Sequence, residues 1–139
     1  MCWEGFNAKQ RVADKDIKVY KILMPCGRIL CSSVTSFHYE FNTLYTMPYF
    51  EQFIEYIFSV ESKTILTKIA WGFHSYSDYY SAFIKSSEPE VVAECIIPKG
   101  SIYYSHSDSC NDVYNVLVSD SIIIKDIPDP RVILFNAEE

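Results

Sequence analysis

The sequence predicts an α+β fold, a single domain over residues 1–139 with a mainly antiparallel, twisted sheet and about two helices. The length of 139 residues is typical of one domain, and no repeat or interior linker divides it. Alternating, β-branched and aromatic segments recur between turn signals, as strands require. One stretch instead carries apolar residues at helical spacing, and a second begins with a helix-capping residue, so we expect a sheet with few helices.

The chain begins with a predicted arm and a first strand. Residues 1–16 predict a loosely packed N-terminal arm that Trp3 and Phe6 anchor to the body. Residues 17–23 alternate as a strand does. One face of this strand carries Ile17, Val19 and, less strictly, Lys21.

The next region changes from strand to helix periodicity. Residues 33–47 are rich in β-branched and aromatic residues and predict a strand region broken at an Asn-Thr pair. Residues 48–62 predict an amphipathic helix, with Pro48 tolerated in its first turn. Its apolar residues recur at i, i+3, i+4, i+7 and i+8, namely Phe50, Phe53, Ile54, Ile57 and Phe58. This register places Phe53 and Ile57 in the core.

The middle of the chain predicts short strands and a second helix. Residues 64–76 predict one or two strands that turn at Gly72. Residues 77–87 predict a short helix that Ser77 caps, with Ala82 and Phe83 facing inward. Pro89 ends this helix.

The last third of the chain predicts further strands. Residues 90–105 predict a buried strand, a tight Pro-Lys-Gly turn and a second strand. Residues 115–127 predict two final strands or one bent strand. Residues 128–139 predict a C-terminal edge strand or tail.

Charge and cysteine content exclude several classes of protein. The net charge of −6 and the absence of a basic stripe argue against direct nucleic-acid binding. Neither a polybasic run nor an apolar stretch of about 20 residues is present, so no membrane association is expected. Five cysteines, an odd number with no signal peptide ahead of them, predict reduced thiols and a cytoplasmic location in a host bacterial cell.

No set of residues has the spacing of a catalytic or metal centre. Cys26 and Cys31 form a C-x4-C pair without a second pair, which is insufficient for zinc. Cys95 lies in an apolar run and Cys110 follows His106 by four residues, without an oxyanion turn. There is no phosphate-binding glycine loop. The sequence therefore predicts no cofactor and favours a protein without catalytic activity, while leaving an enzyme open.

The segment WGFHSYSDYYSAF, residues 71–83, concentrates aromatic residues around His74. If Gly72 bends the chain, His74 and Tyr76 point together toward one cleft. His74 is then either a buried, hydrogen-bonded structural residue or a ligand-facing one. The spacing alone leaves both readings open.

Landmarks along most of the chain resemble a group of short uncharacterised proteins of bacteriophages and gut Bacteroides-type bacteria. The landmarks are A-D-x-D-I-x-V-Y-K at residues 13–21, G-F-H-S at 72–75 and V-x-x-C-x-I-P-K-G-S-x-Y-Y at 92–104, followed by S-D-x-I-I-I at 119–124. The resemblance implies a phage or mobile-element origin. Residues 33–70 depart from the pattern by being longer and more aromatic.

A second resemblance is to ADP-ribosyltransferase-like domains, through GFHSYSDYYSAF and VVAECIIPKGS. It implies rings that sandwich nicotinamide and a late-strand glutamate that orients ribose hydroxyls. The first strand offers only Lys18, Tyr20 and Lys21 where that fold carries Arg or His. Glu94 lies on a different strand, and the last strand offers Asp126. An ADP-ribosyltransferase-like enzyme is therefore an alternative function.

We expect a non-catalytic accessory protein that binds and sequesters a host target, most simply a nucleotide-type signalling ligand. Tyrosines suit this role because their rings stack on bases and their hydroxyls form hydrogen bonds. The expected ligand-binding residues are Tyr20, His74, Ser75, Tyr76, Lys99, Tyr103 and Tyr104. A further alternative is an acidic inhibitor that docks on a basic host nuclease, and a homo-oligomer is also compatible with the sequence.

Overall fold

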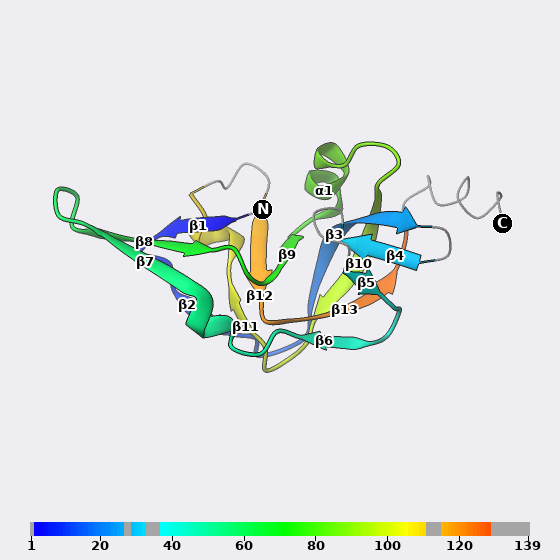
Figure 1. Cartoon of the computed structure of the whole chain (residues 1–139), viewed down its shortest axis with the longest axis horizontal. Helices are drawn as coiled ribbons and strands as arrows, with labels where there is room; N and C mark the ends of the chain where they lie inside the picture. Colours follow the sequence, from blue (N-terminus) through cyan, green and yellow to red (C-terminus); the bar gives the residue numbers. More distant parts are fainter. Residues whose placement is uncertain (1, 27–28, 33–36, 111–114, 129–139) are drawn as a thin grey trace.

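The computed structural model describes residues 2–26, 29–32, 37–110 and 115–128, except for the side chains of residues 26 and 29. The described strands form one sheet of ten strands and one of three, and all strand pairings are antiparallel (Figure 1). The three-stranded sheet contains β1 (Trp3–Phe6), β7 (Ile54–Ser59) and β8 (Thr64–Ile69) in the order β1-β8-β7.

The ten strands of the larger sheet come from the whole length of the chain. They are β2 (Gln10–Val12), β3 (Ile17–Cys26), β4 (Ile29–Ser32), β5 (His38–Tyr39), β6 (Leu44–Thr46), β9 (Phe73–Tyr76), β10 (Val91–Ile97), β11 (Ile102–Tyr104), β12 (Val116–Ser119) and β13 (Ser121–Asp126). The order is β2-β11-β12-β9-β3-β10-β13-β6, with β4 beside β3 and β5 beside β4. The described residues also contain three helical segments: η1 (Phe50–Phe53), α1 (Tyr79–Lys85) and η2 (His106–Asp108).

Strand β10 shows why an almost continuous apolar run forms a strand here. Val91, Ala93, Cys95 and Ile97 face the main core cluster, whereas Val92 packs with Ala82 of α1 and Tyr76 of β9. Because both faces of β10 are covered, apolar residues occupy both. Full burial of a Val or Ile side chain, such as Val91 or Ile97, contributes about 1.5–3 kcal/mol.

Helix α1 confirms one of the two predicted helices and corrects its details. Its N-cap is Asp78, not Ser77, because the Asp78 carboxylate accepts hydrogen bonds from the Ser81 backbone N–H (2.9 Å) and the Ser81 hydroxyl (2.7 Å). Ala82 is fully buried, as predicted. Phe83, predicted to face inward, is exposed.

The helix predicted at 48–62 is wrong. Only η1 is helical, and the chain then forms strand β7, which pairs with β8 from Ile54 to Ser59. Phe53 and Ile57, predicted core residues, are 51% and 47% exposed. The helical spacing arose because apolar side chains occupy both faces of β7, so they recur at i+3 and i+4 as well as at i+2.

The predicted loose arm at residues 1–16 is also corrected. It contains β1 and β2, which pair with β8 and β11. Trp3 is an anchor as predicted, since it is buried and its Nε1–H donates to the Val116 carbonyl oxygen at 3.0 Å. Phe6, the other predicted anchor, is exposed.

The fold is therefore mainly antiparallel sheet, as predicted, but the described residues contain one α-helix where two were expected. This makes the domain closer to an all-β than to an α+β fold. The predicted strands at 17–23, 90–97 and 115–127 are present, the last as β12 and β13. The predicted edge strand or tail at 128–139 lies almost wholly outside the described residues.

Candidate functional site

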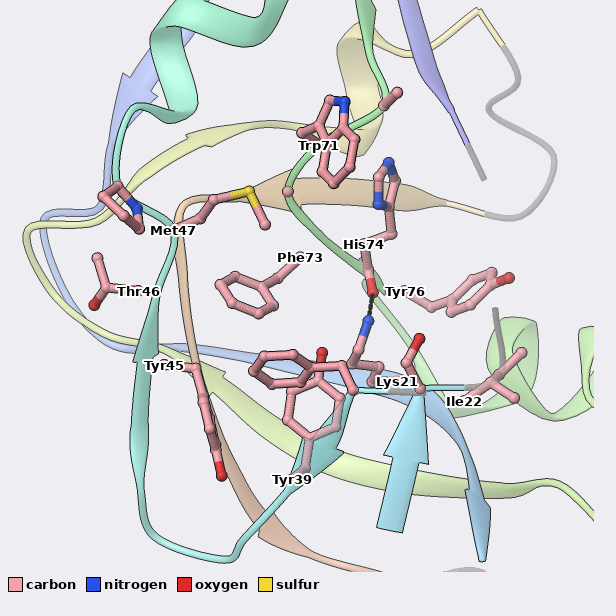
Figure 2. Close-up of a pocket in the computed structure, with 15 residues that line it drawn as sticks. Lys21, Ile22, Tyr39, Tyr45, Thr46, Met47, Trp71, Phe73, His74 and Tyr76 are labelled. Atoms are coloured by element: carbon pink, nitrogen blue, oxygen red, sulfur yellow. Dashed lines mark hydrogen bonds between the residues drawn. The ribbon is translucent and has the colours of Figure 1, made fainter. Parts of the chain in front are cut away.

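A cavity of about 860 Å³ opens on the larger sheet. Its lining comes from strands β3, β4, β5, β6 and β9 and from the short segments beside them (Figure 2). Six of the fifteen lining residues are aromatic: Phe37, Tyr39, Tyr45, Trp71, Phe73 and Tyr76. Such a cavity is large enough for a small organic ligand and presents mostly apolar walls to it.

Three of these rings form a mutually packed wall. The Phe37 ring centroid lies 4.9 Å from that of Tyr39 and 5.5 Å from that of Tyr45, and Tyr39 lies 5.2 Å from Tyr45. All three pairs are edge-to-face, the arrangement that the ring quadrupoles favour. Phe73 adjoins this group, 6.5 Å from Tyr39. Trp71 is 60% exposed, so its indole remains available to a ligand.

Lys21 enters the cavity from β3 at a position that normally holds a core residue. It lies between Val19 and Leu23, both fully buried, on one face of the strand. Its Nζ donates a 2.8 Å hydrogen bond to the His74 carbonyl oxygen and stands 5.8 Å from the centroid of the Tyr39 ring (Figure 2). None of the ion pairs between described residues includes Lys21.

The surroundings of Lys21 destabilise its charge. Burial lowers the pKa of Lys21 from 10.5 to about 8, and the Cys95 thiol opposes this weakly. At neutral pH the side chain is still mostly protonated, so the cavity contains a poorly solvated ammonium. An anionic ligand would offset the lost solvation, since a buried charge gains most from a charged partner.

His74 holds the chain between β8 and β9 in place. Burial, and then the charge of Lys21, lower the pKa of His74 to about 4, against hydrogen bonds to the Ile69 and Gly72 backbone. The ring is therefore neutral near pH 7. Its Nε2–H then donates to the Ile69 carbonyl oxygen at 3.2 Å, and Nδ1 is a hydrogen-bond acceptor.

Gly72 lets this chain segment approach the sheet closely. A Cβ at this position would lie 2.6 Å from Cγ2 of Val118 and 2.8 Å from Cε1 of Phe50, closer than real Cβ atoms come. Only glycine fits without a shift of these neighbours. The close approach sets the positions of Trp71 and Phe73 on either side of it, both of which line the cavity.

The residues expected to bind ligand fall into separate places. His74 and Tyr76 line the cavity. Tyr20 instead lines a second hollow of about 560 Å³ beside α1, where its ring packs edge-to-face on Tyr79 at 5.9 Å. Ser75 is fully buried, and its Oγ has no hydrogen-bond partner in the structure.

The three expected residues near the Pro-Lys-Gly turn do not line either hollow. Lys99 is exposed, and its backbone N–H donates to Asp16. Tyr103 packs against the main core, and Tyr104 is buried against Trp3 with ring centroids 5.4 Å apart. The turn and the start of β9 do lie at the same end of the sheet, but β12 stands between β9 and β11.

Sequence reasoning missed Lys21, Tyr39, Tyr45 and Trp71 as lining residues. A signal for Lys21 was present, because a lysine on the inward face of a strand, between Val19 and Leu23, is unusual. Tyr39 and Tyr45 gave no such signal. They reach the cavity through β5 and β6, whose pairing with distant strands no local pattern specifies.

The described residues contain no group of three or more His, Cys, Asp and Glu side chains that could hold a metal ion. Cys2, Cys95 and Cys110 are free thiols, and the side chain of Cys26 lies outside the described residues. Burial raises the pKa of Cys95 to about 12, so this thiol is not a nucleophile at neutral pH.

Among the described helices, none has the length and apolar character needed to cross a membrane.

No Asp or Glu is found among the described residues that line the cavity. Its polar groups are chiefly the Lys21 ammonium, the neutral His74 ring and tyrosine hydroxyls. This arrangement can stack a planar ring and pair with an anion.

No protein-family model matches the chain, and neither does any curated protein or solved structure.

Proposed function

We propose that this chain is a non-catalytic binding protein that captures an anionic ligand with a planar ring, of the nucleotide type, in the aromatic cavity. The observation that carries the proposal is the Lys21 ammonium, half-buried among aromatic walls without an ion-pair partner among the described residues. A site of this composition gains affinity from an anion and from a ring at the same time.

The two parts of the ligand would bind to different groups. Stacking of a base on an aromatic side chain contributes about 1–3 kcal/mol, and Trp71 is the most exposed aromatic ring among the described residues that line the cavity. A phosphate or similar group would accept hydrogen bonds from Lys21 and raise its pKa toward the ordinary value. Binding should therefore weaken as the pH rises above about 8, where free Lys21 loses its proton.

The biological role that we propose is sequestration of a host signalling nucleotide, as a phage or mobile-element accessory protein acting against host defence. The resemblance of the 13–21, 72–75 and 92–104 landmarks to short phage proteins supports it. Capture without conversion is favoured because none of the described residues that line the cavity carries a carboxylate that could act as acid or base.

The proposal is tested by calorimetric titration with NAD, ADP-ribose, cyclic dinucleotides and adenosine, followed by chromatography of each compound. We expect one of the anionic compounds to bind with a Kd on the order of micromolar and to be recovered intact. Lys21→Met should weaken that binding about 10- to 100-fold while the protein stays folded, because a methionine suits the same apolar site.

Lys18→Met is the matched control. Lys18 is on the same strand, but its side chain is 60% exposed, pairs with Glu94 at 3.4 Å and does not line the cavity. This variant should bind the ligand as the unsubstituted protein does. Equal losses from both variants, or binding by none of the compounds, would contradict the proposal. Release of nicotinamide or a linear product would instead support the ADP-ribosyltransferase-like alternative.

A further inference from the structure

The β7–β8 hairpin projects from the rest of the molecule (Figure 1). It exposes large apolar side chains. These side chains are those of Tyr56, Ile57, Phe58, Val60 and Ile65, together with Phe6 of the neighbouring β1. Exposed apolar groups gathered on one element are typical of an interaction surface.

The pairing register distributes these side chains over both faces of the three-stranded sheet. Phe58 lies opposite Ile65 on one face, the face that also carries Tyr56. On the other face, Phe6 lies opposite Leu66, which lies opposite Ile57. A partner that covered only one face would leave the other apolar face in water.

The outer edge of β7 is open in the described structure. β8 pairs with β7 along one side, and β7 ends the strand order of its sheet. An open edge presents unpaired backbone N–H and C=O groups, which another strand can satisfy. A strand added at this edge would place side chains on both faces at once, as the exposed residues require.

We propose that the occupant of this edge is a second copy of the chain, with the two β7 strands paired antiparallel about a two-fold axis at Ile57. In this register Ile57 lies opposite its own copy on one face, and Tyr56 lies opposite Phe58 of the other copy on the other face. Every apolar residue at the centre of β7 then meets an apolar residue.

Charge selects this register over its neighbours. With the axis at Ile57, Glu55 lies opposite the neutral Ser59 of the other copy. An axis at Tyr56 would put Glu55 against Ile57, and an axis at Phe58 would put Glu55 opposite Glu61. Like charges directly opposite each other destabilise a strand pair, and a buried carboxylate against an apolar group is also unfavourable.

The same axis joins the apolar rows of the two copies. Phe6, Leu66 and Ile57 lie side by side across β1, β8 and β7, and the two-fold axis places a second such row end to end with the first. The result is one continuous row of apolar side chains on one face of a six-stranded sheet. The next row carries the Lys68–Glu4 ion pair of 3.9 Å beside Glu55, so its charges are partly balanced within each copy.

The test depends on the position of Ile57 at the two-fold axis, where it lies opposite Ile57 of the other copy. We expect sedimentation equilibrium of the full chain to show a monomer–dimer equilibrium. Ile57→Glu and Ile57→Lys should each raise the dimer Kd by about tenfold or more, because like charges then face each other. Mixing the two variants in equal amounts should restore the dimer, since Glu then faces Lys. Circular dichroism of each variant checks that it remains folded.

Phe6→Glu is the matched control, because Phe6 is equally apolar and exposed but lies on the opposite edge of the sheet. It should leave the dimer Kd nearly unchanged. The proposal is overturned by a monomer at all protein concentrations, which would leave the edge to a different protein. It is equally overturned if mixing fails to restore the dimer, or if Phe6→Glu weakens it as much as Ile57→Glu does.

Discussion

The ten-stranded and the three-stranded sheet both contain strands rich in apolar side chains, but they differ in how deeply these side chains are buried. In β10 of the larger sheet the apolar residues are buried on both faces, by the main core and by α1. In β7 of the smaller sheet they are exposed on both faces beyond Ile54. Apolar character therefore does not determine burial here. What decides it is whether another layer of the chain reaches that face.

At the junction between the two sheets, covered apolar residues give way abruptly to exposed ones, and we call this change the boundary between covered and uncovered apolar groups. Trp3, Ile54 and Ile69 of the smaller sheet are buried together with Tyr104 and Val118 of the larger one. Only the base of the three-stranded sheet shares this cluster, so stability from packing is concentrated there. The distal hairpin contributes little to the monomer and is free for another role.

The largest difference that we predict within this comparison is between two phenylalanines of η1. Phe50 is 3% exposed in the cluster between the sheets, and Phe53 lies at the other end of the same turn, on the surface beside Trp71. Phe50→Ala should lower the free energy of unfolding by about 3–5 kcal/mol. Phe53→Ala should lower it by about 1 kcal/mol or less. Urea denaturation of both variants measures the difference. Similar losses of unfolding free energy would contradict the assignment of Phe50 to the buried cluster and Phe53 to the surface.

A smaller effect should appear in acid, through the cavity of the larger sheet. The folded-state pKa of His74, about 4, lies below its unfolded value of 6.5, so the unfolded chain binds a proton that the folded chain does not. Stability is therefore complete above pH 6.5 and falls as the pH is lowered toward 4. The loss between pH 6.5 and 5.5 should be about 1 kcal/mol.

His74→Gln tests this assignment, because glutamine can still donate to the Ile69 carbonyl oxygen but does not titrate. The variant should lose about 1 kcal/mol less than the unsubstituted protein between pH 6.5 and 5.5. Denaturant unfolding at both pH values gives the comparison. An identical pH dependence in the two proteins would assign the acid sensitivity to other groups.

The smallest predicted effect has opposite signs at two buried serines of the larger sheet. Ser119 Oγ donates to the Ser121 carbonyl oxygen at 2.9 Å, whereas Ser75 Oγ has no partner in the structure, and both residues are fully buried. Ser119→Ala should lower the free energy of unfolding by about 1 kcal/mol, and Ser75→Ala should raise it slightly, by less than ~1 kcal/mol. A destabilised Ser75→Ala protein would mean that this hydroxyl has a partner.

The parts of the fold predicted correctly are those in which local pattern and burial agree. β3 and β10 alternate or carry apolar runs and are buried accordingly. The prediction of a helix at residues 48–62 was wrong because it assumed that apolar residues face a core. In β7 that assumption does not hold, and a strand with apolar residues on both faces has the spacing of a helix as well.

For a related reason, only two of the expected residues lie at the cavity, and their role in binding a ligand stays a prediction. His74 and Tyr76 follow from the bend at Gly72, which is local, and both line the cavity. Lys99 and Tyr104, the expected residues around the Pro-Lys-Gly turn, do not line the cavity, because β12 lies between β9 and β11 in the sheet. Strand order depends on pairings between residues far apart in the chain, which the local periodicity does not encode.

The two tryptophans lie on opposite sides of this boundary between covered and uncovered apolar groups, and this gives the protein two intrinsic optical probes. Trp3 is 1% exposed with its indole N–H bonded to the Val116 carbonyl oxygen, so its fluorescence should be blue-shifted and insensitive to a soluble quencher such as iodide. Trp71 at the cavity mouth should emit at longer wavelength and be quenched readily. Changes in the long-wavelength emission of Trp71 would thus report occupancy of the cavity. Changes in the short-wavelength emission of Trp3 would report unfolding, in the same sample without any label.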